Sequence, residues 1–450
     1  MSRRIKLKKG LDIRLEGEAD AGKVFTVSSD LYAVKPTDFR SLVPRLEVKV
    51  GDTVRAGDPL FSNKHRPEVK FTSPVSGIVE AIRRGEKRQL LAVVVKADEE
   101  ITCKPFDIPS GDLPREKIIE LLLDSGLWPL IKQRPHDIIA DPSARPKAIF
   151  VTAFDSSPLA PDYRVLLKDD ASALAAGLEA LGKLSGGALH VNARERDAWS
   201  PPRDLPDNAR VNYFSGPHPA GNAGVQIHHL SPIDKGDVAW VVNLPDVALV
   251  GRFLLGGRVD ARKTIALAGP EVTEPAYIET IAGARIGSLV EGRLRDGGHR
   301  RVISGNVLTG DRVEMDSFLG FYHQAITVIP EGDRHEFLGW ATPGFGKFSM
   351  SRTFPSFLFP GRRYRLDTNY HGERRAFVVN GEYEKVLPMD ILPVYLLKAI
   401  LAGDIEKMEQ LGILEVAPED LALCEFACTS KIPVQEIVAG GIELMMKELT

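Results

Sequence analysis

The residues with the most chemical promise lie in a loop that holds a histidine among glycines and prolines. This loop, within Val211–His229, contributes the candidate binding residues Gly216, Pro217, His218, Gly221 and Gly224. Glycine permits positive φ and close backbone approach, whereas proline removes freedom and a hydrogen-bond donor. His218 could bind a metal, carry a proton or bond within a turn. The alternative interpretation of the loop is a structural crossover with tight turns.

Two residue pairs elsewhere have the types of side chain that bind metals. His228 and His229 are adjacent, so on a strand they would point to opposite faces and could not chelate one ion together. Cys424 and Cys428 are four apart and would share one helix face. Two thiolates fall short of the four ligands of a zinc site or an iron–sulfur cluster. We therefore expect buried, inert thiols and no metal site.

Phosphate-binding and nucleophile motifs are absent from the sequence or have the wrong spacing. Residues 344–348, Gly-Phe-Gly-Lys-Phe, resemble a phosphate loop, but Ala341 stands where the first glycine belongs and Phe348 replaces Ser or Thr. The His218 loop (residues 216–224) lacks the G-x-G-x-x-G spacing of a dinucleotide site. No G-x-S-x-G elbow occurs. The sequence thus predicts no catalytic residues.

The bulk properties indicate a multidomain globular protein. A chain of 450 residues is too long for one core and suggests three or four domains. The net charge of −3 gives no reason to expect nucleic acid, and three cysteines exclude a disulfide scaffold. Residues 1–10 are basic but lack the apolar run of a signal peptide. No apolar stretch is long enough to cross a bilayer.

Residues 1–105 are expected to be all-β. Val48–Phe61 and Phe71–Ile82 each have strand–turn–strand spacing, and Gln89–Lys96 adds a strand. This pattern resembles the barrel-sandwich hybrid fold of biotinyl and lipoyl domains, in which a lysine on a hairpin turn carries the prosthetic group. Lys64 is the nearest candidate here, but its flanks match poorly, so we expect an unmodified lysine.

Residues 106–257 alternate strand and helix patterns, which predicts a Rossmann-like, doubly wound parallel sheet. The expected elements are helix Pro114–Ser125, strand Ala148–Ala153, helix Ala171–Lys183, strands Ala188–Asn192, Arg210–Phe214 and Val238–Val242, and helix Val247–Leu255. In such sheets, loops at strand ends bind ligands.

Residues 258–385 suggest a β-grasp-like module of the SLBB type with a β extension. Its segments are Lys263–Pro270, Tyr277–Ala284, Ile286–Glu291 and Arg301–Gly305, followed by strands Ala325–Pro330 and Glu336–Trp340. A Phe- and Pro-rich stretch through Pro360 indicates an apolar interface. Residues 386–450 form a helical domain with patterns at Asp390–Ala402, Asp404–Leu411, Pro418–Thr429 and Val434–Leu449.

Taken in order, several segments resemble the A-subunit family of the sodium-translocating NADH:quinone reductases. The segments are Ile5–Asp12, Val69–Val79, Arg84–Arg88, Arg134–Pro135, Ile149–Ala153, Gly216–Gly221, Val302–Gly305, Leu308–Gly310 and Asp420–Cys424. The resemblance implies a peripheral subunit on the cytoplasmic face of the bacterial inner (plasma) membrane. Its partners would be the other five subunits of a complex that oxidises NADH, reduces ubiquinone or menaquinone and pumps Na⁺. NADH, FAD, FMN, riboflavin and the iron–sulfur centre would belong to those other subunits.

Related flavin-binding subunits of respiratory complex I have a glycine-rich loop against flavin mononucleotide after a Ser-Gly-Leu turn. The corresponding run here, Ser125–Asp137, contains no glycine after Gly126. Trp128, Leu130, Ile131 and Arg134 would fill the space of the flavin phosphate. The resemblance therefore implies a scaffold without redox cofactors.

Two functions follow from this resemblance. One is a structural subunit that binds ubiquinone, with His218 and the backbone of Gly221–Gly224 as donors to the quinone carbonyls. The other is an autonomous flavin-dependent NADH dehydrogenase. The basic N-terminus, the Phe354–Phe359 patch and the helical tail would dock to membrane subunits.

Overall fold

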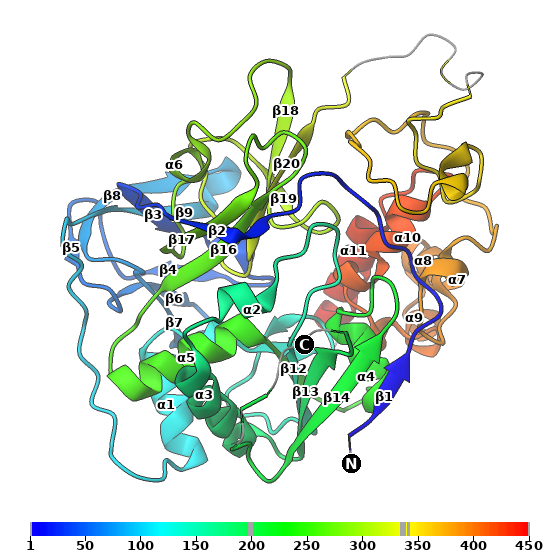
Figure 1. The fold of residues 1–450 in the computed structure, drawn as a ribbon. Helices are drawn as coiled ribbons and strands as arrows, with labels where there is room; N and C mark the ends of the chain where they lie inside the picture. Colours follow the sequence, from blue (N-terminus) through cyan, green and yellow to red (C-terminus); the bar gives the residue numbers. More distant parts are fainter. Residues whose placement is uncertain (1, 197–200, 203, 334–338, 340–342, 449–450) are drawn as a thin grey trace.

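The computed structural model describes residues 2–196, 201–202, 204–333, 339 and 343–448. Its strands form sheets of seven, six, four and three strands. In Figure 1 the α/β unit lies below the β-rich units, and the C-terminal helices pack at one side. No helix within the described ranges is long and apolar enough to cross a membrane.

The seven-stranded sheet has the order β1-β14-β13-β12-β15-β10-β11. Five strands are parallel, and β10 and β11 form an antiparallel edge. The strands are β1 (Arg4–Lys6), β10 (Lys132–Arg134), β11 (Ile138–Ile139), β12 (Ala148–Thr152), β13 (Ala188–Arg194), β14 (Ala209–Ser215) and β15 (Ala239–Asn243). The associated helices are α1 (Arg115–Asp124), α2 (Tyr163–Leu166), α3 (Ala171–Leu184), α4 (Ala223–Leu230) and α5 (Leu244–Gly256). The predicted parallel α/β sheet is confirmed.

Both faces of this sheet are buried, each in a different core. Successive side chains of a strand point to opposite faces. Ile149 and Val151 of β12 join the core that contains α3 and α5, whereas Ala148 and Phe150 join the core of α4 and the C-terminal helices. Burial on both sides explains why these strands are continuous apolar runs rather than alternating ones.

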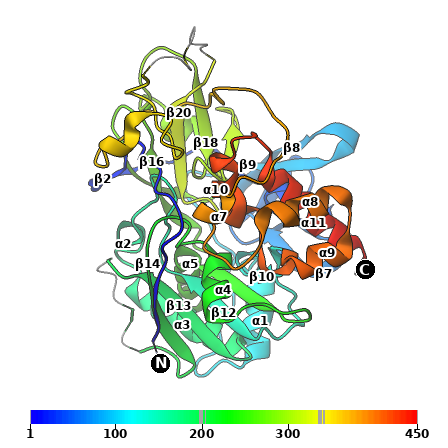
Figure 2. The ribbon, with the colours of Figure 1, turned by 90° about the vertical axis from the view of Figure 1, so that its right-hand side faces the viewer.

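The C-terminal helices complete the second core beside α4 (Figure 2). They are α7 (Tyr383–Val386), α8 (Pro393–Ala402), α9 (Ile405–Gln410), α10 (Ala422–Ala427) and α11 (Val434–Glu448). The helix predicted over Pro418–Thr429 is divided into a 3₁₀ turn, η6 (Pro418–Leu421), and α10. The strand geometry considered for His228 and His229 is wrong, because both lie in α4.

The six-stranded sheet forms a unit of its own, here called the six-stranded unit. Its strand order is β19-β18-β20-β16-β17-β2. Its elements are β2 (Asp20–Thr26), β16 (Arg262–Ala268), β17 (Ala276–Ile281), α6 (Ile286–Val290), β18 (Arg300–Ser304), β19 (Asp311–Val313) and β20 (Ala325–Pro330). Of the strand predicted over Glu336–Trp340, all residues but Gly339 lie outside the described ranges, so the strand stays a prediction.

The barrel-sandwich unit consists of the two smaller sheets, β3-β9-β8-β5 and β4-β6-β7. Its strands are β3 (Leu31–Val34), β4 (Pro44–Leu46), β5 (Thr53–Val54), β6 (Pro59–Asn63), β7 (Arg66–Thr72), β8 (Gly77–Arg84) and β9 (Leu90–Ala97). The predicted strand–turn–strand segments exist, but each crosses between the two sheets. The N-terminal strands β1 and β2 pair with β14 and β17 instead, so residues 1–105 contribute to all four sheets.

The close packing of α3 against α5 predicts how a substitution at Gly251 changes stability. A Cβ added to Gly251 would lie 1.7 Å from the carbonyl oxygen of Ala173, whereas one added to Gly440 in α11 would meet nothing within 4 Å. We expect Gly251→Ala to destabilise the fold by about 2–4 kcal/mol. The control Gly440→Ala should be neutral or stabilise by up to about 1 kcal/mol, because alanine favours helix. Thermal unfolding tests both, and equal midpoints would contradict the packing.

Candidate functional site

A cavity of about 590 Å³ lies between the α/β unit, the six-stranded unit and the C-terminal helices. Thr152 and Phe154 enter it from the end of β12, and Asn243 enters from the end of β15. The chain continues from β12 to β13 on one side, while β15 lies on the other. This is the switch point of the sheet, where ligands of open α/β folds bind.

His218 lies in the wall of this cavity and is only 3% exposed. Its Nδ1 is 3.0 Å from the hydroxyl of Ser156, and that hydroxyl accepts the N–H of Gly221 at 2.8 Å. Within the described part of the chain, His218 Nε2 has no hydrogen-bond partner. Burial lowers the pKa of His218 to about 4. The cavity wall therefore contains a neutral imidazole whose Nε2 is buried and has no partner among the described residues.

The remaining candidates of the His218 loop serve packing. A Cβ on Gly216, which has a φ of +132°, would lie 2.6 Å from the carbonyl oxygen of Leu7. Pro217 packs close to Gly10. At Gly224 a Cβ would lie 2.2 Å from an Asp420 carboxylate oxygen. The structure thus places only His218 and Gly221 at the cavity, and the crossover interpretation describes Gly216, Pro217 and Gly224.

The other polar residues of the cavity were not indicated by any motif or spacing. Tyr322, His323 and Gln324 come from the turn before β20, and Asp155 follows β12. Among described residues, neither amide atom of the buried Gln324 side chain has a partner. Burial lowers the pKa of His323 to about 3, and its Nδ1 lies 2.8 Å from Ser304 Oγ. Asp155 and Asn243 had a usable signal, because each comes just past a predicted strand.

Carboxylates outnumber cations in the cavity wall. The acidic residues are Asp38, Asp137, Asp155, Asp311, Glu419 and Glu443, and the basic ones are Arg40 and Lys132. Burial raises the pKa of Asp155, although Ser157 donates to it from its N–H and its hydroxyl. Burial opposes ionisation of Asp137, but Lys132 and Arg134 hold its pKa at about 2. Because Lys35, Lys132 and Arg134 pair with Asp38, Asp137 and Glu419, the wall is less negative than the number of its carboxylates suggests.

One wall of the cavity is fixed by a buried arginine. Arg134 of β10 donates to Asp420 at 3.1 Å and to Glu419 at 2.6 Å. Burial opposes its charge, but the carboxylates of Asp420, Asp137 and Glu419 keep the pKa of Arg134 above its ordinary value. Asn222 also donates to the carbonyl of Glu419 at 2.9 Å. The sheet, the His218 loop and η6 are thus tied together.

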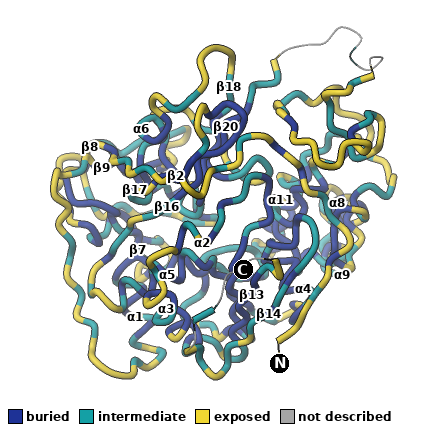
Figure 3. The backbone as a smooth tube through the Cα atoms, in the orientation of Figure 1, coloured by how far each residue is buried: buried dark blue, intermediate teal, exposed yellow. Residues whose placement is uncertain are grey.

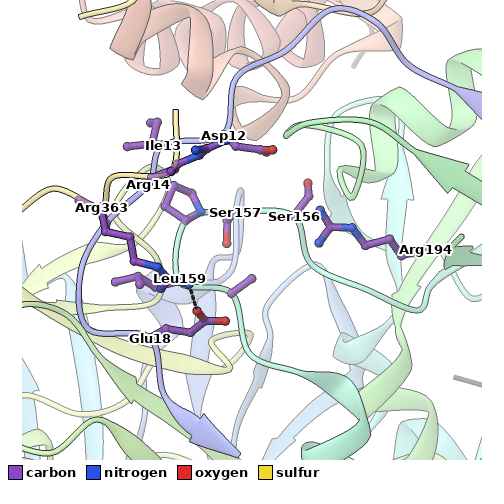
Figure 4. Close-up of a pocket in the computed structure, with 13 residues that line it drawn as sticks. Asp12, Ile13, Arg14, Glu18, Ser156, Ser157, Leu159, Arg194 and Arg363 are labelled. Carbon is purple, nitrogen blue, oxygen red and sulfur yellow. Dashed lines mark hydrogen bonds and ion pairs between the residues drawn. The ribbon is translucent and has the colours of Figure 1, made fainter. Parts of the chain in front are cut away.

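A second hollow of about 450 Å³ lies on the other side of the loop that follows β12 (Figure 4). Arg194 and Arg363 enter it from opposite sides, and Arg363 pairs with Glu18 at 2.5 Å. Ser157 and Leu159 line both hollows. The loop after β12 is therefore the partition between them.

The other chemical candidates of the sequence lie away from the cavity. Lys64 is exposed on the β6–β7 hairpin turn. Cys424 is buried in α10 and Cys428 is buried just after that helix. His228 contacts Glu415 at 2.8 Å and His229 the carbonyl of Pro388 at 2.9 Å. No group of three potential metal ligands occurs within the described ranges.

The fold and cavity define a class, a multidomain protein with a Rossmann-like sheet whose ligand edge faces an SLBB-type unit. Three family models match it: the NqrA N-terminal barrel-sandwich hybrid domain over residues 5–98, the NqrA second alpha/beta domain over 113–259 and the NQRA C-terminal domain of the SLBB type over 264–315. These matches confirm the predicted fold class.

Relatives that match this chain over nearly its full length identify the family. The chain is 39% identical to the A subunit of the Na⁺-translocating NADH-quinone reductase of Rhodopirellula baltica, covering 98% of each chain. It is 38% identical to the A subunits from Hahella chejuensis and Vibrio vulnificus, covering 99% of this chain and 100% of theirs. The chain belongs to this family, the A subunits of an oxidoreductase complex.

Among solved structures, an NAD⁺-reducing [NiFe]-hydrogenase chain matches at 13% identity with a TM-score of 0.39. The match covers 74% of this chain and 61% of the hydrogenase chain.

The lowered pKa of His218 predicts a pH-dependent stability. Between about pH 6.5 and 4 the unfolded chain binds a proton that the folded chain excludes, so stability is lost as the pH falls through this range. His218→Asn, which can still bond Ser156, should keep about 2 kcal/mol more of its neutral-pH stability near pH 4. Urea unfolding at both pH values measures the difference, and parallel losses in the two proteins would contradict it.

Proposed function

We propose that this chain is a cytoplasmic, membrane-peripheral scaffold of the complex, that it holds no redox cofactor, and that its central cavity binds the quinone head group. Electron transfer, NADH oxidation and Na⁺ translocation then belong to the other five subunits. The single observation that carries the proposal is the uncharged imidazole of His218, whose Nε2 has no partner among the described residues, in an interdomain cavity with an anionic wall.

Packing around the run Ser125–Asp137 supports a scaffold without flavin. Trp128 is fully buried, donates from Nε1 to the carbonyl of Ala140 at 2.8 Å, and packs edge-on against Trp240. Ile131 is also fully buried, and the hydroxyl of Tyr322 donates to the carbonyl of Pro129 at 2.7 Å. Trp128, Pro129 and Ile131 are thus committed to packing and hydrogen bonds at the place where a flavin phosphate would need bare backbone.

The cavity itself suits a neutral ring better than a flavin phosphate. Its wall has six carboxylates against two cations, and the carboxylates that no cation neutralises would repel a phosphate dianion. Its apolar wall includes Leu130, Phe154 and Val241, and His218 and Gln324 supply polar atoms that no other described residue engages. A quinone head group needs an apolar slot and one or two donors to its carbonyl oxygens. The alternative, an autonomous flavoenzyme, would need a phosphate site in this anionic wall.

Quinone binding depends on His218 in this proposal. Photo-crosslinking the complex with a quinone analogue should label the peptides around His218 and Gln324. His218→Ala should weaken the analogue's affinity about tenfold, the usual cost of one hydrogen bond to a buried partner. The control His228→Ala, whose imidazole bonds Glu415 outside the cavity, should leave affinity unchanged. Labelling confined to distant segments would refute the site.

Absence of a flavin is tested on the full chain by itself. We expect the purified chain to be colourless and to show no flavin absorbance after extraction. A stoichiometric, tightly bound flavin would instead support the autonomous NADH dehydrogenase. This outcome would leave the family membership unaffected.

The helical tail is expected to contribute to assembly, but deletion is the wrong test. Buried residues between Met389 and Met445 share a core with Phe150 and Phe214, so removal of the tail would expose the sheet. Substitution of the exposed Leu401 of α8 by Gln avoids this problem. If α8 docks to another subunit, this variant should co-purify less with the complex while keeping its thermal midpoint; unchanged co-purification would exclude that face.

A further inference from the structure

Residues 343–366, the Phe-rich segment, present an exposed surface that is both apolar and basic. The segment contains five Phe, five Lys or Arg and no acidic residue. Phe345, Phe357, Leu358 and Phe359 are 63, 51, 62 and 48% exposed. Figure 3 shows the tube here largely in the colour of exposed residues, at the periphery of the molecule. Contiguous apolar surface of this kind marks an interaction site.

The exposed side chains belong to a turn that ring packing and hydrogen bonds hold in place. Phe348 packs inward against Tyr364 and against Phe426 just beyond, with ring centroids 5.7 and 6.2 Å away. The N–H of Phe354 donates to Ser349 Oγ at 2.9 Å, and the N–H of Ser349 donates to Ser356 Oγ at 3.2 Å. The 3₁₀ turn η4 (Pro355–Leu358) starts with a proline. The outer side chains are therefore exposed even though the segment that carries them is folded.

The cations beside this turn are of two kinds. Arg363 and Arg365 are paired with Glu18 and Glu271. Arg352 instead lies over the Phe357 ring, 5.5 Å from its centroid, and Arg362 lies over the Tyr364 ring at 5.4 Å. Arg352 thus sits next to the exposed Phe357 ring. Arg362 is exposed itself, but it lies over the buried Tyr364 ring and donates to the carbonyl of Phe345 at 2.8 Å.

We propose that the Phe-rich segment binds directly to an anionic lipid bilayer. Phe357, Leu358 and Phe359 enter the interface, and Arg352 and Arg362 contact lipid phosphates. Aromatic and aliphatic side chains flanked by cations are the pattern of an interfacial anchor. Three consecutive apolar residues on one short turn form a narrow wedge, which suits lipid headgroups better than a broad protein interface. The inference rests on the proposed membrane-peripheral role and names the lipid contact.

Vesicle flotation of the full chain tests the proposal with a matched pair of variants. Leu358 and Leu255 are both 62% exposed, and Leu255 lies in α5, away from the segment. The wild-type chain should float with phosphatidylglycerol-containing vesicles more than with phosphatidylcholine vesicles, and salt should weaken binding. Leu358→Gln should bind about tenfold more weakly, whereas Leu255→Gln should bind like wild type.

Several outcomes would overturn the lipid contact. One is a wild-type chain that does not float; another is equal flotation of Leu358→Gln and wild type. Loss of the Leu358→Gln chain from the detergent-solubilised complex would assign the segment to a protein partner within that complex. Concentration-dependent self-association abolished by Leu358→Gln would assign it to a second copy. Failure of the scaffold role has a different readout, a wild-type chain that does not co-purify with the complex.

Discussion

Burial of both faces of the parallel sheet is the constraint on which this architecture depends. A parallel sheet has two apolar faces, and each must be covered. Here α3 and α5 cover one face, and α4 together with the C-terminal helices covers the other. Elements more than 200 residues apart therefore share one core, and the cavity lies at the edge where these layers meet. The helical tail is part of the α/β core rather than an appendage.

The same constraint explains the composition of the His218 loop. The N-terminal strand β1 adds to the edge of the sheet beside β14, and the following segment passes close to Gly216. On the other side Asp420 of η6 approaches Gly224. A Cβ at Gly216 or Gly224 would collide with one of these two segments, and one at Gly221 would lie 2.7 Å from the backbone nitrogen of Ser156. The loop is therefore glycine-rich because three segments pack closely against it. Its polar members, His218 and Asn222, line the cavity.

The sequence predicted those elements whose burial can be recognised from the apolar pattern of their own residues. The runs Ala148–Thr152 and Ala239–Asn243 could be assigned because a strand buried on both faces is apolar throughout. The secondary structure of the segment with His228 and His229 was harder to assign, because a short helix and a strand can have similar apolar spacing. Contacts between residues that are far apart in the sequence could not be predicted, because no pattern in either segment indicates the other. Arg134 meets Asp420 across 286 positions, and Gln324 reaches the cavity from another unit.

The cavity shows why a hollow at the ligand edge of such a sheet does not depend on the side chains that line it. The switch point arises from strand order, so the hollow remains as long as the sheet does. The charge of its wall is set by side chains, which can change without loss of the fold. In this chain Trp128 and Ile131 occupy the core beside the hollow, and carboxylates dominate its wall. The fold therefore supplies a hollow at this edge, while its side chains set the charge and shape that a ligand meets there.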